Sequence, residues 1–181
     1  MFFRINGDIV EMVDTYKYLG FHLHEFMDYN VHANKTAEAG SRALGAMLSK
    51  FHSLKNVTYT TFTNLYHSCV TSVLDHASEI WGNCKTNSCD QVQQRALRYF
   101  LGVHRFCPLP VINGDMGWNT CSVRRKLNML RMWNRFIKMS NDNLAKKVFL
   151  WDYSLLNSTW CSDIENILDD VGYIDILYRF I

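Results

Sequence analysis

The sequence predicts a mainly α-helical fold, a helical bundle preceded by one N-terminal β-hairpin. Two observations predict it. Over most of residues 28–150, apolar side chains recur at steps of three and four, which is the spacing of one helix face. Strand-like sequence is confined to residues 1–27, around Asn6-Gly7. With 181 residues, 48% of them hydrophobic, the chain is long enough to bury a substantial core.

The first expected element is a hairpin of two short apolar strands on either side of Asn6-Gly7. Asn-Gly is the preferred centre of a type I′ turn, because both residues tolerate positive φ. The returning strand leads into Tyr16-Lys17-Tyr18-Leu19-Gly20. A lone hairpin is at best marginally stable in water, so we interpret this segment as the rim of a larger sheet.

Two long helices are expected next. The first spans residues 31–51, and its small Ala37 and Gly40 would let a neighbouring helix approach closely. The second begins after Asn56 or Thr58, either of which can cap it. Its buried stripe is expected to comprise Phe62, Leu65, Tyr66, Cys69, Val70, Val73 and Leu74.

A third helix is expected to begin at Ser88, which forms a plausible capping box with Gln91, and to stop before Gly102. Pro108 and Pro110 then predict an extended connector, because the residue before a proline disfavours the helical conformation.

The fourth helix is expected to begin after Thr120 or Ser122, and two shorter helices are expected at 143–149 and 162–170. Trp81, Trp118 and Trp133 are expected to be packing residues. The chain is therefore divided into a hairpin and strand at 1–27, a helical region at 28–150 and an acidic, apolar tail at 151–181.

The net charge of +2 conceals a strong segregation of charge along the chain. Residues 1–90 carry a net charge of −2, residues 91–147 carry +9, and residues 148–181 carry −5. A concentrated basic segment favours binding to a polyanion, because local potential and counterion release depend on clustering. The alternative is that the acidic tail folds back on the basic segment and neutralises it.

No catalytic or metal-binding residues are assigned. The adjacent carboxylates Asp169 and Asp170 could hold Mg²⁺, but they lie in a predicted helix and are interpreted as a solvated helix end. The six cysteines include no Cys-x-x-Cys pair, which favours reduced thiols in an intracellular chain of the nucleus or cytoplasm. The sequence has no apolar run long enough for a membrane span, so no membrane partner is expected.

Four sequence runs occur in an informative order. They are Tyr16-Lys17-Tyr18-Leu19-Gly20-Phe21, Ser78-Glu79-Ile80-Trp81-Gly82, Gln93-Gln94-Arg95-Ala96-Leu97-Arg98-Tyr99-Phe100-Leu101-Gly102-Val103 and Asp115-Met116-Gly117-Trp118. In this order they resemble the end of the palm, the thumb and the connector of reverse transcriptases of non-LTR (LINE-type) retrotransposons. The resemblance covers residues 1–150.

The resemblance implies a thumb-like and connector-like bundle that positions an RNA/DNA template–primer during RNA-directed DNA synthesis. The fingers, most of the palm and the catalytic Tyr-x-Asp-Asp strand are missing from this sequence. The missing palm and fingers are therefore expected partners, and Mg²⁺ is expected only in the full-length polymerase. This chain by itself is expected to have no cofactor and not to polymerise.

Arginine binds phosphate bidentately, and phosphate contacts need cations spaced along rigid helices. The residues expected to bind nucleic acid on these grounds are Tyr18, Gly20, Arg95, Arg98, Arg124, Arg125, Arg131, Arg135 and Lys138. The alternative interpretation is a stand-alone helical module for protein interaction or nucleic-acid binding, without catalysis.

Overall fold

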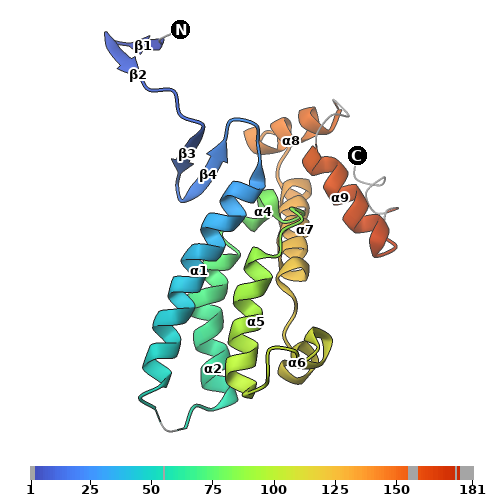
Figure 1. Ribbon diagram of the computed structural model, residues 1–181. Coiled ribbons are helices and arrows are strands. Elements are labelled where there is room, and N and C mark those ends of the chain that lie inside the picture. The colour runs from blue at the N-terminus through green and yellow to red at the C-terminus, as the bar shows by residue number, and fades with distance from the viewer. Residues whose placement is uncertain (1–2, 55, 155–158, 174, 176–181) are drawn as a thin grey trace.

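The computed structural model describes residues 3–54, 56–154, 159–173 and 175, and it confirms the mainly α-helical fold (Figure 1). The described elements are β1 (Phe3–Ile5), β2 (Asp8–Val10), β3 (Thr15–Tyr18), β4 (Phe21–His24), α1 (Tyr29–Phe51), α2 (Tyr59–Tyr66), the π-helical turn η1 (His67–Thr71), α3 (Ser72–Leu74), α4 (Ser78–Trp81), α5 (Ser88–Leu101), α6 (Leu109–Met116), α7 (Cys121–Lys138), α8 (Leu144–Ser154) and α9 (Thr159–Asp170).

Two hairpins precede the helices, where the sequence predicted one. The predicted hairpin pairs β1 with β2, and Asn6 and Gly7 both have positive φ, at 52° and 94°. The second hairpin pairs β3 with β4 through a turn at Leu19 and Gly20, which also have positive φ. Leucine rarely adopts a positive φ, so no local signal in the sequence predicts the second turn. In Figure 1, the first hairpin extends away from the helices and the second lies against them.

The helical bundle is formed by α1, the continuous run α2–η1–α3, α5 and α7 (Figure 1). The close approach predicted at Gly40 is confirmed, because a Cβ on this residue would overlap the side chain of Leu74. Asp28 caps α1 by accepting a hydrogen bond from the backbone N–H of Asn30 at 2.9 Å, and Thr58 caps α2.

Only part of the stripe predicted for the second helix is buried. Phe62, Tyr66, Val70 and Leu74, at steps of four, are buried in the core. Leu65 and Cys69 are exposed, and Val73 is half-buried, so the prediction was too wide. The neighbouring helices cover one line of side chains on this helix, and the residues beside that line face solvent.

Two local predictions around the third helix were wrong. Ser88 forms no capping box; its backbone N–H donates instead to the Thr86 hydroxyl. The residues after Pro108 are not extended, because α6 begins at Leu109. Proline is tolerated in the first turn of a helix, where its missing N–H would have no partner inside the helix. Both prolines therefore open a helix.

The C-terminal helices form a second hydrophobic cluster on α7. Met129 and Trp133 of α7 pack with residues of α8 and α9, while Trp81 and Trp118 belong to the larger first cluster, so the three tryptophans are buried as predicted. The predicted boundary at residue 150 falls inside α8. Asp170, one of the two adjacent carboxylates, forms an exposed ion pair with Lys126 at 3.4 Å. In the described part of the chain, no helix combines the length and apolar character that crossing a bilayer requires.

Candidate functional site

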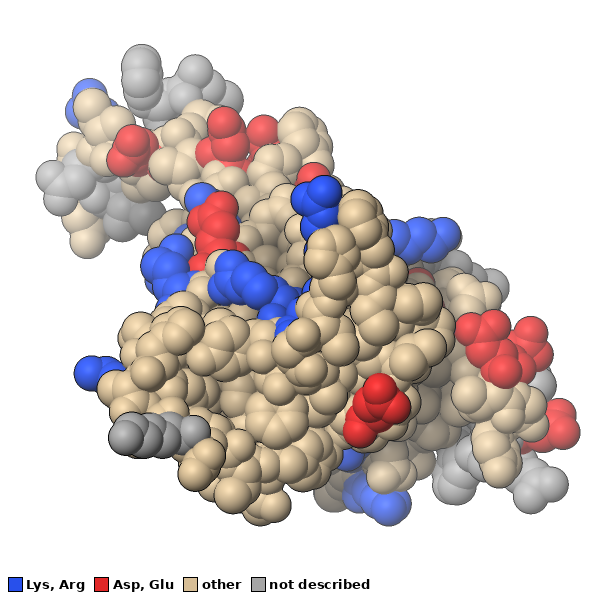
Figure 2. Space-filling model, turned by 60° about the horizontal axis from the view of Figure 1, so that its bottom comes forward, with Lys and Arg blue, Asp and Glu red and all other residues tan. Residues whose placement is uncertain are grey.

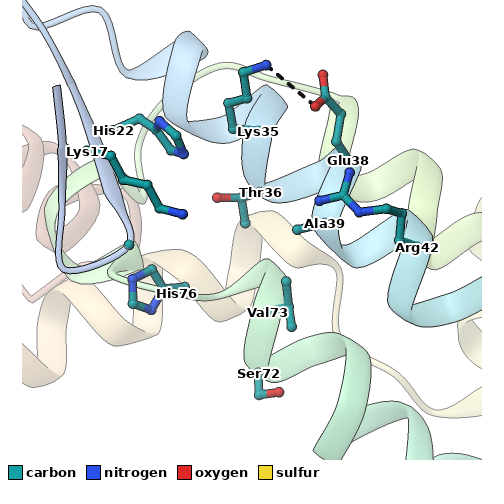
Figure 3. A pocket seen from close by; sticks show the side chains of 11 residues that line it. Lys17, His22, Lys35, Thr36, Glu38, Ala39, Arg42, Ser72, Val73 and His76 are labelled. Carbon is teal, nitrogen blue, oxygen red and sulfur yellow. Dashed lines mark ion pairs between the residues drawn. The ribbon is translucent and has the colours of Figure 1, made fainter. Parts of the chain in front are cut away.

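Three basic side chains surround a hollow of about 560 Å³ between the β3–β4 hairpin, α1 and α3 (Figure 3). We call this hollow the basic cleft. It is lined by Lys17, Gly20, His22, Lys35, Thr36, Glu38, Ala39, Arg42, Ser72, Val73 and His76. In Figure 3, Lys17 and Arg42 extend toward each other from the hairpin and from α1, across Thr36 and Ala39.

Regular secondary structure places these cations on one surface. Lys35 and Arg42 are seven residues apart in α1, which is close to two helical turns, so they share a face. Lys17 lies directly opposite His22 in the hairpin, and side chains of paired residues project from the same face of a sheet. The alternating residues Tyr16 and Tyr18 project from the other face.

The basic cleft carries an excess of positive charge. Its carboxylate is Glu38, whose Oε2 lies 3.6 Å from Lys35 Nζ, and both side chains are more than half exposed, at 57% and 54%. Solvent weakens a pair of this kind strongly. Lys17 and Arg42 form no ion pair with any described residue. In the space-filling view of Figure 2, basic side chains gather around an acidic one on the visible face, beside a broad uncharged area.

Three histidines hold the hairpin against the helices beside the basic cleft. The buried His32 accepts a hydrogen bond at Nδ1 from the backbone N–H of His22, at 3.2 Å. Its Nε2 lies 3.4 Å from the His76 carbonyl oxygen, which suits an Nε2–H donor. His76 Nε2 lies 3.3 Å from the Leu19 carbonyl oxygen, and a Cβ at Gly20 would meet that ring at 2.9 Å. Glycine is therefore required here both by its positive φ and by space.

Two of the histidines that hold the hairpin, His22 and His32, favour the neutral form. Burial lowers the pKa of His22, and the charges of Lys17 and Lys35 lower it further. Burial also lowers the pKa of His32. The lysines and the arginine of the basic cleft supply positive charge that does not depend on these two histidines.

Two residues of the β3–β4 hairpin, Tyr18 and Gly20, were predicted to bind nucleic acid. Gly20 lines the basic cleft, and Tyr18 does not. The Tyr18 side chain is 58% exposed on the opposite face of the hairpin. It shares that face with Tyr16 and Leu23, which are also exposed.

The predictions for Arg124 and Arg125 need correction, because both guanidinium groups are used inside the fold. Arg124 Nε and Nη2 donate to the two carboxylate oxygens of Asp75 at 2.8 and 3.3 Å, and Nη1 donates to Gln93 and to the Asn119 carbonyl oxygen. Burial alone would lower the pKa of Arg124, but the hydrogen bond and charge of Asp75 raise it on balance. The guanidinium therefore stays charged.

Arg125 is 2% exposed, and its guanidinium carbon lies 5.1 Å from the centre of the Trp81 ring. Its Nη2 is 4.0 Å from a carboxylate oxygen of Asp90. An arginine in this position packs α7 against α4 and the start of α5. Its guanidinium group is therefore not accessible to a phosphate.

The other predicted residues lie on two further surfaces. Arg95 is exposed on α5, where its Nη2 donates to the Ser41 carbonyl oxygen at 3.0 Å, and Arg98 is half-buried on the same helix. Arg131 and Arg135 line a hollow of about 300 Å³ with Glu79. Lys138 is exposed at the end of α7. The structure therefore does not bring the residues that were predicted to bind nucleic acid onto one surface.

Sequence reasoning missed Lys17, Lys35 and Arg42 as a group, because the net charge of residues 1–90 is negative. The seven-residue spacing of Lys35 and Arg42 was the available signal. The position of Lys17 opposite them depends on the second hairpin, which the sequence did not predict.

A second large hollow, of about 860 Å³, is apolar and lies between α4, α7, α8 and α9. It is lined by Tyr29, Glu79, Ile80, Met132, Phe136, Asn143, Leu144, Ala145, Val148, Phe149, Trp151, Asp152 and Trp160. It offers apolar contact area and no lysine or arginine, so it is not suited to binding an anion.

The comparisons with known proteins identify no relative: no family model, no curated protein and no solved structure matches this chain. Within the described residues, no group of three or more histidine, cysteine, aspartate or glutamate side chains is arranged to hold a metal ion. The chemistry that these residues support at the basic cleft is the binding of an anion.

Proposed function

We propose that this chain binds the sugar–phosphate backbone of nucleic acid through the basic cleft, as the template–primer-positioning part of a non-LTR retrotransposon reverse transcriptase. The observation that carries the proposal is the convergence of Lys17, Lys35 and Arg42 on one hollow in which Glu38 is the only carboxylate among the lining residues. The four sequence runs that resemble this polymerase family support the choice of nucleic acid.

The chemistry of the three cations suits phosphate. Lysine supplies a compact charge with three donors, and arginine supplies a planar fork that can bind two phosphate oxygens at once. Because Lys17 and Arg42 have no carboxylate partner among the described residues, binding a phosphate breaks no ion pair of theirs. The three cations lie in a paired hairpin and in a long helix, and this regular structure fixes the distances between their backbone positions.

The proposal separates binding from catalysis. The described residues supply a binding surface, and the carboxylates that hold Mg²⁺ would belong to the palm of the complete polymerase. The role of this chain is then to hold the template–primer duplex while chemistry takes place elsewhere in the enzyme.

The test measures the binding of the purified chain to an RNA–DNA hybrid duplex. Fluorescence anisotropy gives the affinity at each concentration of a salt series. The cleft variant is Lys17→Glu/Arg42→Glu. The control is Lys85→Glu/Lys147→Glu, which makes the same change in net charge at two exposed lysines outside the basic cleft. Each lost phosphate contact lowers the slope of log K against log salt by about 1, so the cleft variant is expected to lose about 2.

The control variant should keep a slope close to that of the unmodified chain. Equal losses in the two variants would mean that overall charge, and not the basic cleft, governs binding. The absence of binding by the unmodified chain would overturn the proposal and favour the protein-interaction alternative. A third variant, Arg131→Glu/Arg135→Glu, tests the surface of α7 that the sequence predicted.

A further inference from the structure

The basic cleft is a hollow with a floor, and not an open stripe of cations. Its floor includes the buried Thr36, the half-buried Ala39 and the half-buried Val73. Residues of the hairpin, of α1 and of α3 line it, so it is bounded by three different elements (Figure 3). An internal phosphodiester continues as a chain on both sides, so it can lie across the mouth of this hollow but cannot enter it end-on. A phosphate at the end of a strand can enter a hollow.

We propose that the basic cleft is a binding site for the terminal phosphate of a nucleic-acid strand, a phosphomonoester. This inference rests on the proposed function and names the group that the site recognises. The cations Lys17, Lys35 and Arg42 would surround the phosphate, with the Ser72 hydroxyl and the His76 ring within the same lining.

The balance of charge favours a phosphomonoester over a phosphodiester. The three cations and Glu38 leave an excess of two positive charges in the basic cleft. A phosphomonoester carries about −1.5 to −2 near pH 7 and has three free oxygens, whereas a diester carries one charge. Because Coulomb energy scales with charge, the terminal group gains about twice the attraction at the same distance.

The number of basic side chains in the basic cleft also matches the three free oxygens of a phosphomonoester. Lys17 and Arg42 face each other from opposite sides of the hollow and are not held by carboxylates among the described residues (Figure 3). The Lys35–Glu38 pair is long and exposed, so Lys35 can turn from Glu38 to a phosphate at little cost. Three oxygens could therefore each receive a charged donor.

The experiment compares three oligonucleotide duplexes of one sequence, with a 5′-phosphate, with a 3′-phosphate, and with hydroxyl groups at both ends. A phosphorylated duplex is expected to bind the unmodified chain about tenfold more tightly than the hydroxyl duplex. This preference should vanish in Lys17→Ala/Arg42→Ala and persist in Lys85→Ala/Lys147→Ala. Circular dichroism of each variant confirms that the fold is retained.

Equal affinity for all three duplexes would overturn this inference while leaving backbone binding intact. No binding to any of them would overturn the proposed function as well, so the two failures are distinguishable. Inorganic phosphate is the competitor that separates the sources of the ligand. If it displaces the phosphorylated duplex at equimolar concentration, the site takes free phosphate and the assignment to a strand end is wrong.

Discussion

Replacing Arg124 with methionine should destabilise the fold strongly, although the sequence suggested a surface contact to nucleic acid. Both partners of the Arg124–Asp75 ion pair are only 14% exposed, and the guanidinium also donates to Gln93 and to the Asn119 carbonyl oxygen. Removing one partner of a buried pair typically costs about 3–5 kcal/mol, because the other charge is left buried without compensation. We expect Arg124→Met to lower the free energy of unfolding by about 3 kcal/mol.

Urea denaturation measures this loss. With a slope of about 2 kcal/mol per molar urea, the midpoint should fall by about 1.5 M. The double variant Arg124→Met/Asp75→Leu should recover part of the loss, since no charge then remains unpaired. Arg131→Met is the matched control on the exposed side of the same helix, and its effect should stay within about 0.5 kcal/mol. A normal midpoint in Arg124→Met, combined with weaker binding to nucleic acid, would refute the internal role.

Three further predictions follow from other contacts. Gly40→Ala should destabilise the fold by about 1–3 kcal/mol in thermal unfolding, whereas Gly45→Ala, where the added Cβ meets nothing within 4 Å, should be neutral or stabilising. Because burial lowers the pKa of His32, the unfolded chain binds more protons, so the free energy of unfolding should fall as the pH drops below about 6.5. In His32→Gln, urea midpoints at pH 7.5 and 5.5 should differ less than in the unmodified chain, and an equal difference would contradict this role. Burial raises the pKa of Cys121 to about 12, so iodoacetamide should modify the exposed Cys69 first, and early labelling of Cys121 in mass spectra would argue against its burial.

The sequence was sufficient for elements whose signals are local. The turn at Asn6-Gly7 appears as predicted, and the cap is Thr58, one of the two predicted candidates, because each depends on residues close together in the chain. The helical period located α1 and α7, and Gly40 marked the site of close packing against another helix.

The sequence was insufficient where long-range packing decides the outcome. Charge patterning could not separate Arg131 on the surface from the half-buried Arg124 and the buried Arg125, because the carboxylates near Arg124 and Arg125 come from distant segments. The basic cleft was missed for the same reason, since Lys17 reaches Arg42 only through the pairing of β3 with β4 and the packing of that hairpin on α1.

The central claim is that nucleic acid binds at the basic cleft, and backbone amide NMR tests it most directly. The ¹⁵N-labelled chain is titrated with an RNA–DNA hybrid, and the shifts of the amide signals are mapped by residue. Binding at the basic cleft predicts the largest shifts around Lys17–Gly20, Lys35–Arg42 and Ser72–His76. Shifts confined to Arg131–Lys138 of α7, or no shifts at saturating hybrid, would contradict it.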